Sequence, residues 1–90
     1  MDNRSRIQFI RDTLEGEFAP LELEVIDDSH LHAGHASARG GGHFRVRIVS
    51  EAFAGRKPLE RHRMIYRVLQ AAMARDIHAL SIQALTPDET

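Results

Sequence analysis

The chain has 90 residues, of which 42 % are hydrophobic and 28 % charged, a composition typical of one ordered domain spanning residues 1–90. It contains no cysteine, which excludes a disulfide scaffold, a thiol catalyst and a metal site built from its own thiolates. No apolar run approaches the roughly 18–20 residues of a membrane span, and residues 1–4 lack the pattern of a signal peptide. We therefore expect a soluble, cytoplasmic protein that does not engage a membrane.

The net charge of −1 is distributed in three blocks of opposite sign. Residues 1–38 hold eight acids and three bases, residues 76–90 hold three acids and no base, and residues 39–75 hold nine bases and two acids. The middle block therefore carries a charge of +7. Such a block is typical of a face that binds nucleic acid or an acidic partner, but arginine is also a common solvated helix residue. Charge alone leaves both interpretations open.

The first half of the chain shows one helical and two strand-like patterns. Apolar residues at steps of three and four predict a helix over residues 4–18, with Ile7, Ile10, Leu14 and Phe18 on one stripe. Its start can be capped by one of three polar residues, Asp2, Asn3 or Ser5.

Alternation of apolar and polar residues predicts the strands over residues 21–28 and 43–50. The side chains expected to face inward are Leu21, Leu23 and Val25 in the first strand and Phe44, Val46 and Ile48 in the second. The glycine-rich segment between them, about residues 29–42, is too long for a tight hairpin, so we expect a flexible loop with a functional role.

In the second half, Pro58 suits the first turn of a helix that extends to about residue 75, with a short helical turn before it near residues 54–58. Steps of 100° place one set of residues on a broad inward face: Leu59, His62, Ile65, Tyr66, Leu69, Ala72 and Met73. Arg56, Arg63 and Arg67 lie opposite. A third strand is predicted over residues 77–85, with His78, Leu80, Ile82 and Ala84 sharing one side, and residues 87–90 are expected to fray.

The order of elements predicts an α+β fold with a three-stranded mixed sheet. The first two strands are expected to pair antiparallel, and the second and third to run parallel through a right-handed helical crossover. The helices then pack on one face of the sheet.

Histidines are concentrated around the glycine-rich segment. His30, His32, His35 and His43 lie within 14 residues, and imidazole is a common metal ligand near neutral pH. A solvated polar loop explains the same residues without a metal, so both interpretations stay open.

Two further histidines lie outside this segment. His62 falls among apolar residues of the predicted helix, which favours a buried, hydrogen-bonded core role. His78 opens the last strand, where it either closes the sheet edge or reaches solvent near the glycine-rich segment. No H-E-x-x-H, phosphate-loop or nucleophile-elbow motif is present, so we expect no enzymatic activity.

Several segments in this order resemble the BolA family. They span about residues 5–89 and comprise Val25-Ile26-Asp27-Asp28-Ser29, His32-Ala33-Gly34-His35, His43-Phe44-Arg45-Val46, Ile48-Val49-Ser50, Phe53-Ala54-Gly55, Leu59-Glu60-Arg61-His62-Arg63-Met64-Ile65-Tyr66, Ile77-His78-Ala79-Leu80 and Leu85-Thr86-Pro87-Asp88-Glu89. The resemblance implies an αββααβ fold similar to a class II KH domain, in agreement with the order of elements above.

The resemblance also implies a role in iron–sulfur cluster handling, in which a monothiol glutaredoxin pairs with the protein and shares a 2Fe–2S cluster. The family's strand-start histidine matches His78, and its loop ligand matches His32, with His35 as the competing choice. The partner's cysteine and glutathione would supply thiolates, so the isolated chain is expected to lack the cluster and to be a monomer or weak homodimer.

A second function implied by the resemblance is DNA binding by a transcriptional regulator. The candidate residues for contacts with nucleic acid or a partner are Arg56, Lys57, Arg61, Arg63 and Arg67. The chain lacks the G-x-x-G clamp of KH domains and offers few aromatic residues for base stacking. The same arginines suit an acidic face of a glutaredoxin, and we assign His62 to fold support and partner contact.

Overall fold

A computed structural model of the protein describes residues 2–28, 42–73 and 77–90, apart from the side chain of His78. The main elements are α1 (Asn3–Phe18), β1 (Glu22–Asp27), β2 (Gly42–Val49), α2 (Pro58–Val68), α3 (Gln70–Met73) and β3 (Ile77–Leu85). Two short 3₁₀ helices, η3 (Glu51–Phe53) and η4 (Pro87–Glu89), precede α2 and follow β3. This order confirms the predicted α+β fold and its αββααβ arrangement.

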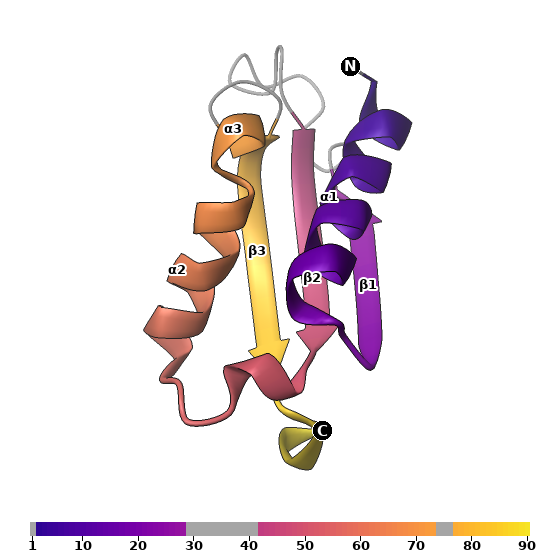
Figure 1. Cartoon of the computed structure of the whole chain (residues 1–90). Helices are drawn as coiled ribbons and strands as arrows, with labels where there is room; N and C mark the ends of the chain where they lie inside the picture. The colour runs from indigo at the N-terminus through magenta and orange to yellow at the C-terminus, as the bar shows by residue number, and fades with distance from the viewer. Residues whose placement is uncertain (1, 29–41, 74–76) are drawn as a thin grey trace.

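The sheet has the order β1-β2-β3, with β2 in the centre. β1 runs antiparallel to β2, whereas β3 runs parallel to it, and both pairings match the prediction. Helices α1 and α2 lie on the same face of the sheet (Figure 1). The opposite face carries exposed side chains such as Glu24, Arg45 and Ser81.

Helix α1 begins and ends at identifiable capping contacts. The Asp2 carboxylate accepts a hydrogen bond from the backbone N–H of Ser5 at 2.8 Å, and this bond lowers the pKa of Asp2. After Phe18, Ala19 adopts a left-handed conformation with φ 44°, and its N–H donates to the Glu15 carbonyl at 3.2 Å. The chain therefore reverses directly into β1.

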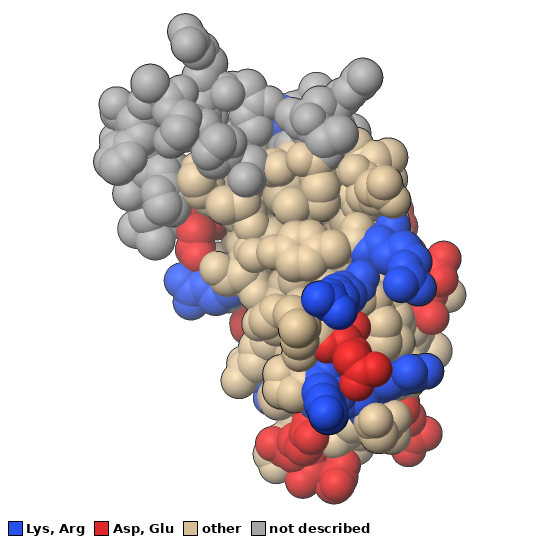
Figure 2. All heavy atoms as spheres, turned by 90° about the vertical axis from the view of Figure 1, so that its left-hand side faces the viewer, with Lys and Arg blue, Asp and Glu red and all other residues tan. Residues whose placement is uncertain are grey.

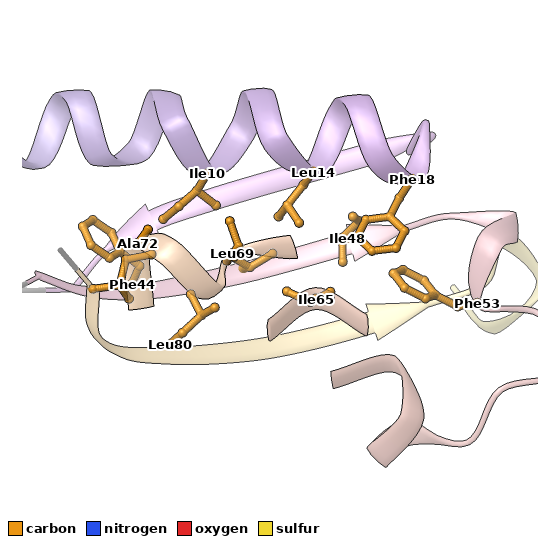
Figure 3. Packing of buried hydrophobic residues seen from close by; sticks show 12 residues of the cluster. Ile10, Leu14, Phe18, Phe44, Ile48, Phe53, Ile65, Leu69, Ala72 and Leu80 are labelled. Atoms are coloured by element: carbon orange, nitrogen blue, oxygen red, sulfur yellow. The ribbon is translucent and has the colours of Figure 1, made fainter. Parts of the chain in front are cut away.

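The core lies between the helices and the inner face of the sheet. Ile10, Leu14 and Phe18 of α1 point toward the sheet, and side chains from β2, α2, α3 and β3 meet them (Figure 3). The rings of Phe18 and Phe53 pack with their centroids 5.2 Å apart. The predicted inward residues of β2 are all buried, and so are His43 and Val49 near the two ends of the strand.

Three apolar residues predicted to face inward are exposed instead. Leu21, 67 % exposed, precedes β1 at the reversal of the chain and lies outside the packed layer. Leu59 and Tyr66 are 60 % and 38 % exposed, so the inward face predicted for the helix was too broad. The buried residues of α2 and of the segment after it are Arg61, Ile65, Leu69 and Ala72, so the buried face is turned toward Arg61 and away from Leu59 and Tyr66.

Within the described segments, no helix combines the length and hydrophobicity that crossing a membrane requires.

Candidate functional site

The starts of β2 and β3 and the end of β1 lie at the same end of the sheet. Gly42 opens β2 opposite Ile77, the first residue of β3, and a register shift follows before His43 pairs with Ala79. On the other side of β2, the backbone N–H of Asp28 donates to the His43 carbonyl at 2.8 Å. The topology therefore places both strand starts beside the point where the chain leaves β1.

The N-terminus of α1 is tied to this end of the sheet. The side chain of Asn3 donates to the Asp27 carboxylate at 3.0 Å and accepts from Arg6 at 2.7 Å. A Cβ atom at Gly42 would collide with the ring of Phe44, which is buried in the core. Glycine is therefore required sterically where β2 begins, next to the start of α1.

The predicted cluster ligands can be placed only in part. His78 is the second residue of β3, one position after the residue paired with Gly42, and its side chain lies outside the described part of the chain. His32 and His35 also lie outside the described residues, as does most of the predicted loop over residues 29–42. Gly42 belongs to β2 rather than to that loop. Within residues 2–28, 42–73 and 77–90, no three His, Asp or Glu side chains converge as a metal site.

Arg61 was predicted to contact a partner, but the structure buries it. Its side chain is 9 % exposed, and its guanidinium donates hydrogen bonds to both carboxylate oxygens of Glu89, at 2.6 and 3.0 Å. The same guanidinium donates to the backbone carbonyls of Arg56 at 2.9 Å and Ala84 at 3.0 Å. The prediction of an exposed Arg61 is wrong, because this residue faces the sheet and binds the C-terminal segment.

The same contact corrects the prediction that residues 87–90 fray. These residues include η4, whose Glu89 also accepts from the backbone N–H of Thr86 at 2.8 Å. The hydrogen bond from Arg61, assisted by that from Thr86, lowers the pKa of Glu89 to about 2. In return, the bond to Glu89 raises the pKa of Arg61 above its ordinary value. We call this arrangement of Arg61, Glu89 and the two carbonyls the C-terminal clamp.

Three of the four remaining predicted basic residues line one depression of the surface. Arg56, Arg63 and Arg67 surround a depression of about 340 Å³ together with Glu60 and Met64, which we call the basic depression. Lys57 is exposed at the start of α2, where its backbone N–H donates to the Glu60 carboxylate at 3.0 Å. Arg56 also lies 3.9 Å from Glu60, a loose ion pair.

Arg63 and Arg67 differ from the arginines of the sheet in their ion pairing with other described residues. On the open face of the sheet, Arg45 pairs with Asp28 at 2.9 Å and Arg47 with Glu22 at 2.7 Å. Among the described residues, the guanidinium groups of Arg63 and Arg67 form no ion pair. Figure 2 shows Lys and Arg side chains gathered along one flank of the α2 side of the molecule. Arg56, Arg63 and Arg67 therefore lie together as predicted, and their role in binding stays a prediction.

His62 occupies the margin of the packed face of α2. It is half-buried, and its imidazole makes no hydrogen bond to any other described residue. The expectation of a buried, hydrogen-bonded core histidine is therefore not met.

Sequence reasoning missed the exposure of two apolar residues of α2, Leu59 and Tyr66. Both were counted as core because their spacing matched an inward face. The position of α2 beside β3, an outer strand of the sheet, leaves part of this face uncovered (Figure 1). The hydroxyl of Tyr66 donates to the carbonyl of Leu80 in β3 at 3.1 Å, so its ring borders the edge of the sheet.

Comparison with known proteins identifies the class to which this fold belongs. The family model described as "BolA-like protein" matches residues 14–89. The BolA domain of SufE1 from Arabidopsis thaliana superposes with a TM-score of 0.86 at 50 % identity, and 96 % of each chain is covered. BolA1 from the same plant superposes with a TM-score of 0.84 at 39 % identity, covering 100 % of this chain and 98 % of that one.

The chain therefore belongs to the BolA family. Among full-length relatives, it is 50 % identical over 94 % of its length to "SufE-like protein 1, chloroplastic/mitochondrial" of Arabidopsis thaliana, but it spans only 24 % of that protein. It is 40 % identical to "Protein BOLA1, chloroplastic" of that plant, covering 96 % of this chain and 56 % of the relative. It is 39 % identical to the "DNA-binding transcriptional regulator BolA" of Escherichia coli (strain K12), covering 89 % of this chain and 74 % of the relative.

Proposed function

We propose that this chain is a non-enzymatic adaptor that pairs with a monothiol glutaredoxin and shares a 2Fe–2S cluster with it. The ligands from this chain are His78 and one histidine of the preceding segment, which is His32 or alternatively His35. The observation that carries the proposal is the position of His78 in a chain of the BolA family. His78 is the second residue of β3 and lies beside the start of β2, at the sheet end where the chain leaves β1 toward His32 and His35.

The donor chemistry of the chain fits this role. Imidazole nitrogens ligate iron, and the chain has no cysteine, so any thiolates must come from the partner and from glutathione. A cluster bound in this way supplies one-electron chemistry, and two imidazoles on one iron raise its reduction potential relative to an all-thiolate site. The adaptor itself contributes ligands and a docking surface for the partner.

Anaerobic reconstitution tests the assignment of His78. The protein is mixed with a monothiol glutaredoxin, glutathione, iron and sulfide, and visible absorption and circular dichroism report the cluster. We expect the spectrum of the mixed complex to be lost in His78→Ala and retained in Gln83→Ala, a matched control at an exposed position of the same strand. His78→Cys should keep a cluster with an altered spectrum, because a thiolate replaces the imidazole.

An unchanged mixed-complex spectrum in His78→Ala would refute the ligand assignment. Far-ultraviolet circular dichroism of each variant separates loss of a ligand from loss of the fold. His32→Ala and His35→Ala, compared in the same assay, identify the second ligand, since only the ligating histidine should alter the spectrum.

A second candidate function is DNA binding. It is favoured by the name of the Escherichia coli relative and by Arg63 and Arg67, which stand one helical turn apart without an acidic partner among the described residues. Contacts to phosphates release counterions, so log K should fall with log salt by about 0.9 for each phosphate neutralised. Arg63→Ala should reduce that slope by about one contact. A salt-independent or undetectable signal at low ionic strength would eliminate this function, whatever the outcome with glutaredoxin.

A further inference from the structure

Helix α2 presents an exposed apolar strip that the core does not use. Leu59 and Tyr66 are 60 % and 38 % exposed and lie seven residues apart. Two helical turns separate them by about 10 Å and return them to nearly the same side of the helix. Figure 2 shows an uncharged surface across this side of the molecule, flanked by Lys and Arg side chains.

The strip is held in place by its surroundings. The hydroxyl of Tyr66 is anchored to the carbonyl of Leu80, so little freedom of the ring remains to be lost on binding. Leu59 follows Pro58 in the first turn of α2, where Glu60 bonds the backbone N–H of Lys57. A preformed pair of apolar anchors is a favourable starting point for recognition.

Two arginines border the strip. Arg63 lies between the two apolar residues in sequence, and Arg67 follows one turn later on the adjoining flank of the helix. Both arginines line the basic depression and form no ion pair with another described residue. The surface therefore offers two apolar contacts with cations along one side.

We propose that this face of α2, formed by Leu59, Arg63, Tyr66 and Arg67, docks an amphipathic helix of a partner protein that carries acidic residues beside its apolar stripe. Apolar side chains of the partner cover Leu59 and Tyr66, and its carboxylates meet the two arginines. A nucleic-acid backbone matches this surface less well, because an exposed leucine gains nothing from phosphate.

This surface is distinct from the candidate cluster site. α2 begins at the end of the sheet opposite the starts of β2 and β3, so Leu59 lies far along the molecule from the backbone of His78 (Figure 1). The proposal therefore does not depend on whether a cluster is bound.

A designed peptide tests the proposal on the whole chain. The probe is a fluorescein-labelled 16-residue helical peptide with leucines at helical spacing and glutamates flanking them, and anisotropy reports binding at low salt. We expect saturable binding that weakens about tenfold in Leu59→Gln, and to a similar extent in Arg63→Ala. Leu21→Gln is the matched control, since that leucine is 67 % exposed but lies before β1.

A peptide with lysines in place of the glutamates should not bind, because its charge matches that of the arginines. The proposal is overturned if Leu59→Gln binds as well as the unmodified protein, or if Leu21→Gln weakens binding equally. It is also overturned if a single-stranded oligonucleotide binds in a manner that depends on both Leu59 and Arg63 while the peptide does not bind. Concentration-dependent self-association that Leu59→Gln abolishes, without peptide binding, would instead assign the face to a second copy of the chain.

Discussion

Replacing Arg61 by leucine tests the C-terminal clamp, which joins α2 to the end of the chain. The guanidinium bridges α2 to the end of β3 and to η4, joining Arg61 to a carboxylate 28 positions away. Leucine preserves much of the apolar stem but removes every donor. The backbone carbonyls of Arg56 and Ala84 then lose this donor, and Glu89 loses its counter-ion.

The size of the effect follows from the number and kind of bonds lost. Hydrogen bonds to charged groups contribute roughly 1.5–3 kcal/mol each, and unsatisfied partners add to the loss when they are buried. The clamp is only part-buried, and Glu89 keeps access to solvent. We therefore expect Arg61→Leu to lower the free energy of unfolding by about 2–4 kcal/mol.

Urea unfolding followed by circular dichroism measures this loss, and Arg63→Leu is the matched control. Arg63 is exposed two residues away on the same helix and forms no ion pair among the described residues, so its replacement should cost less than about 0.5 kcal/mol. Equal effects of the two substitutions at an unchanged m-value would refute the structural role assigned to Arg61.

The remaining predictions concern acid stability, the core and two glycines. The clamp lowers the pKa of Glu89 from 4.5 to about 2, so its contribution to the free energy of unfolding is complete above pH 4.5 and is lost as the pH falls toward 2. Urea unfolding across this range should therefore show the protein losing its stability advantage over Glu89→Gln as the pH falls. Leu14→Ala opens a cavity in the fully buried core and should cost about 2–5 kcal/mol by urea unfolding. Gly55 has φ +75°, so Gly55→Ala should lower the melting temperature, whereas Gly16→Ala, in a helix with open space around it, should stabilise by about 0.4–1 kcal/mol.

The strands were the elements most accurately predicted from the sequence. β3 was predicted over residues 77–85 and spans Ile77–Leu85, and the alternation around Phe44, Val46 and Ile48 correctly identified the buried face of β2. A period of two leaves only two possible faces, and the apolar side chains select the buried one. The connection lengths then determined which strands pair antiparallel and which run parallel.

The helix that follows was harder to predict, because a broad arc of α2 is apolar. Periodicity groups residues by face, but the angle at which a helix meets the sheet depends on packing against other elements. Ile65 and Leu69 are buried as predicted, but the buried face extends to Arg61 and leaves Leu59 and Tyr66 exposed. Four of the five predicted basic residues are therefore exposed and Arg61 is buried, while their role in binding stays a prediction.

The sequence by itself determined the order of elements, the pairing of the strands, and the presence of imidazole and arginine without any thiolate. Only the tertiary structure decided which arginine binds the chain's own C-terminal segment and which remain available to a partner. That choice depends on Glu89, which lies far from Arg61 in sequence and approaches it only when β3 packs beside α2. Local patterns encode neighbours along one element, whereas a contact between distant elements depends on the assembled fold.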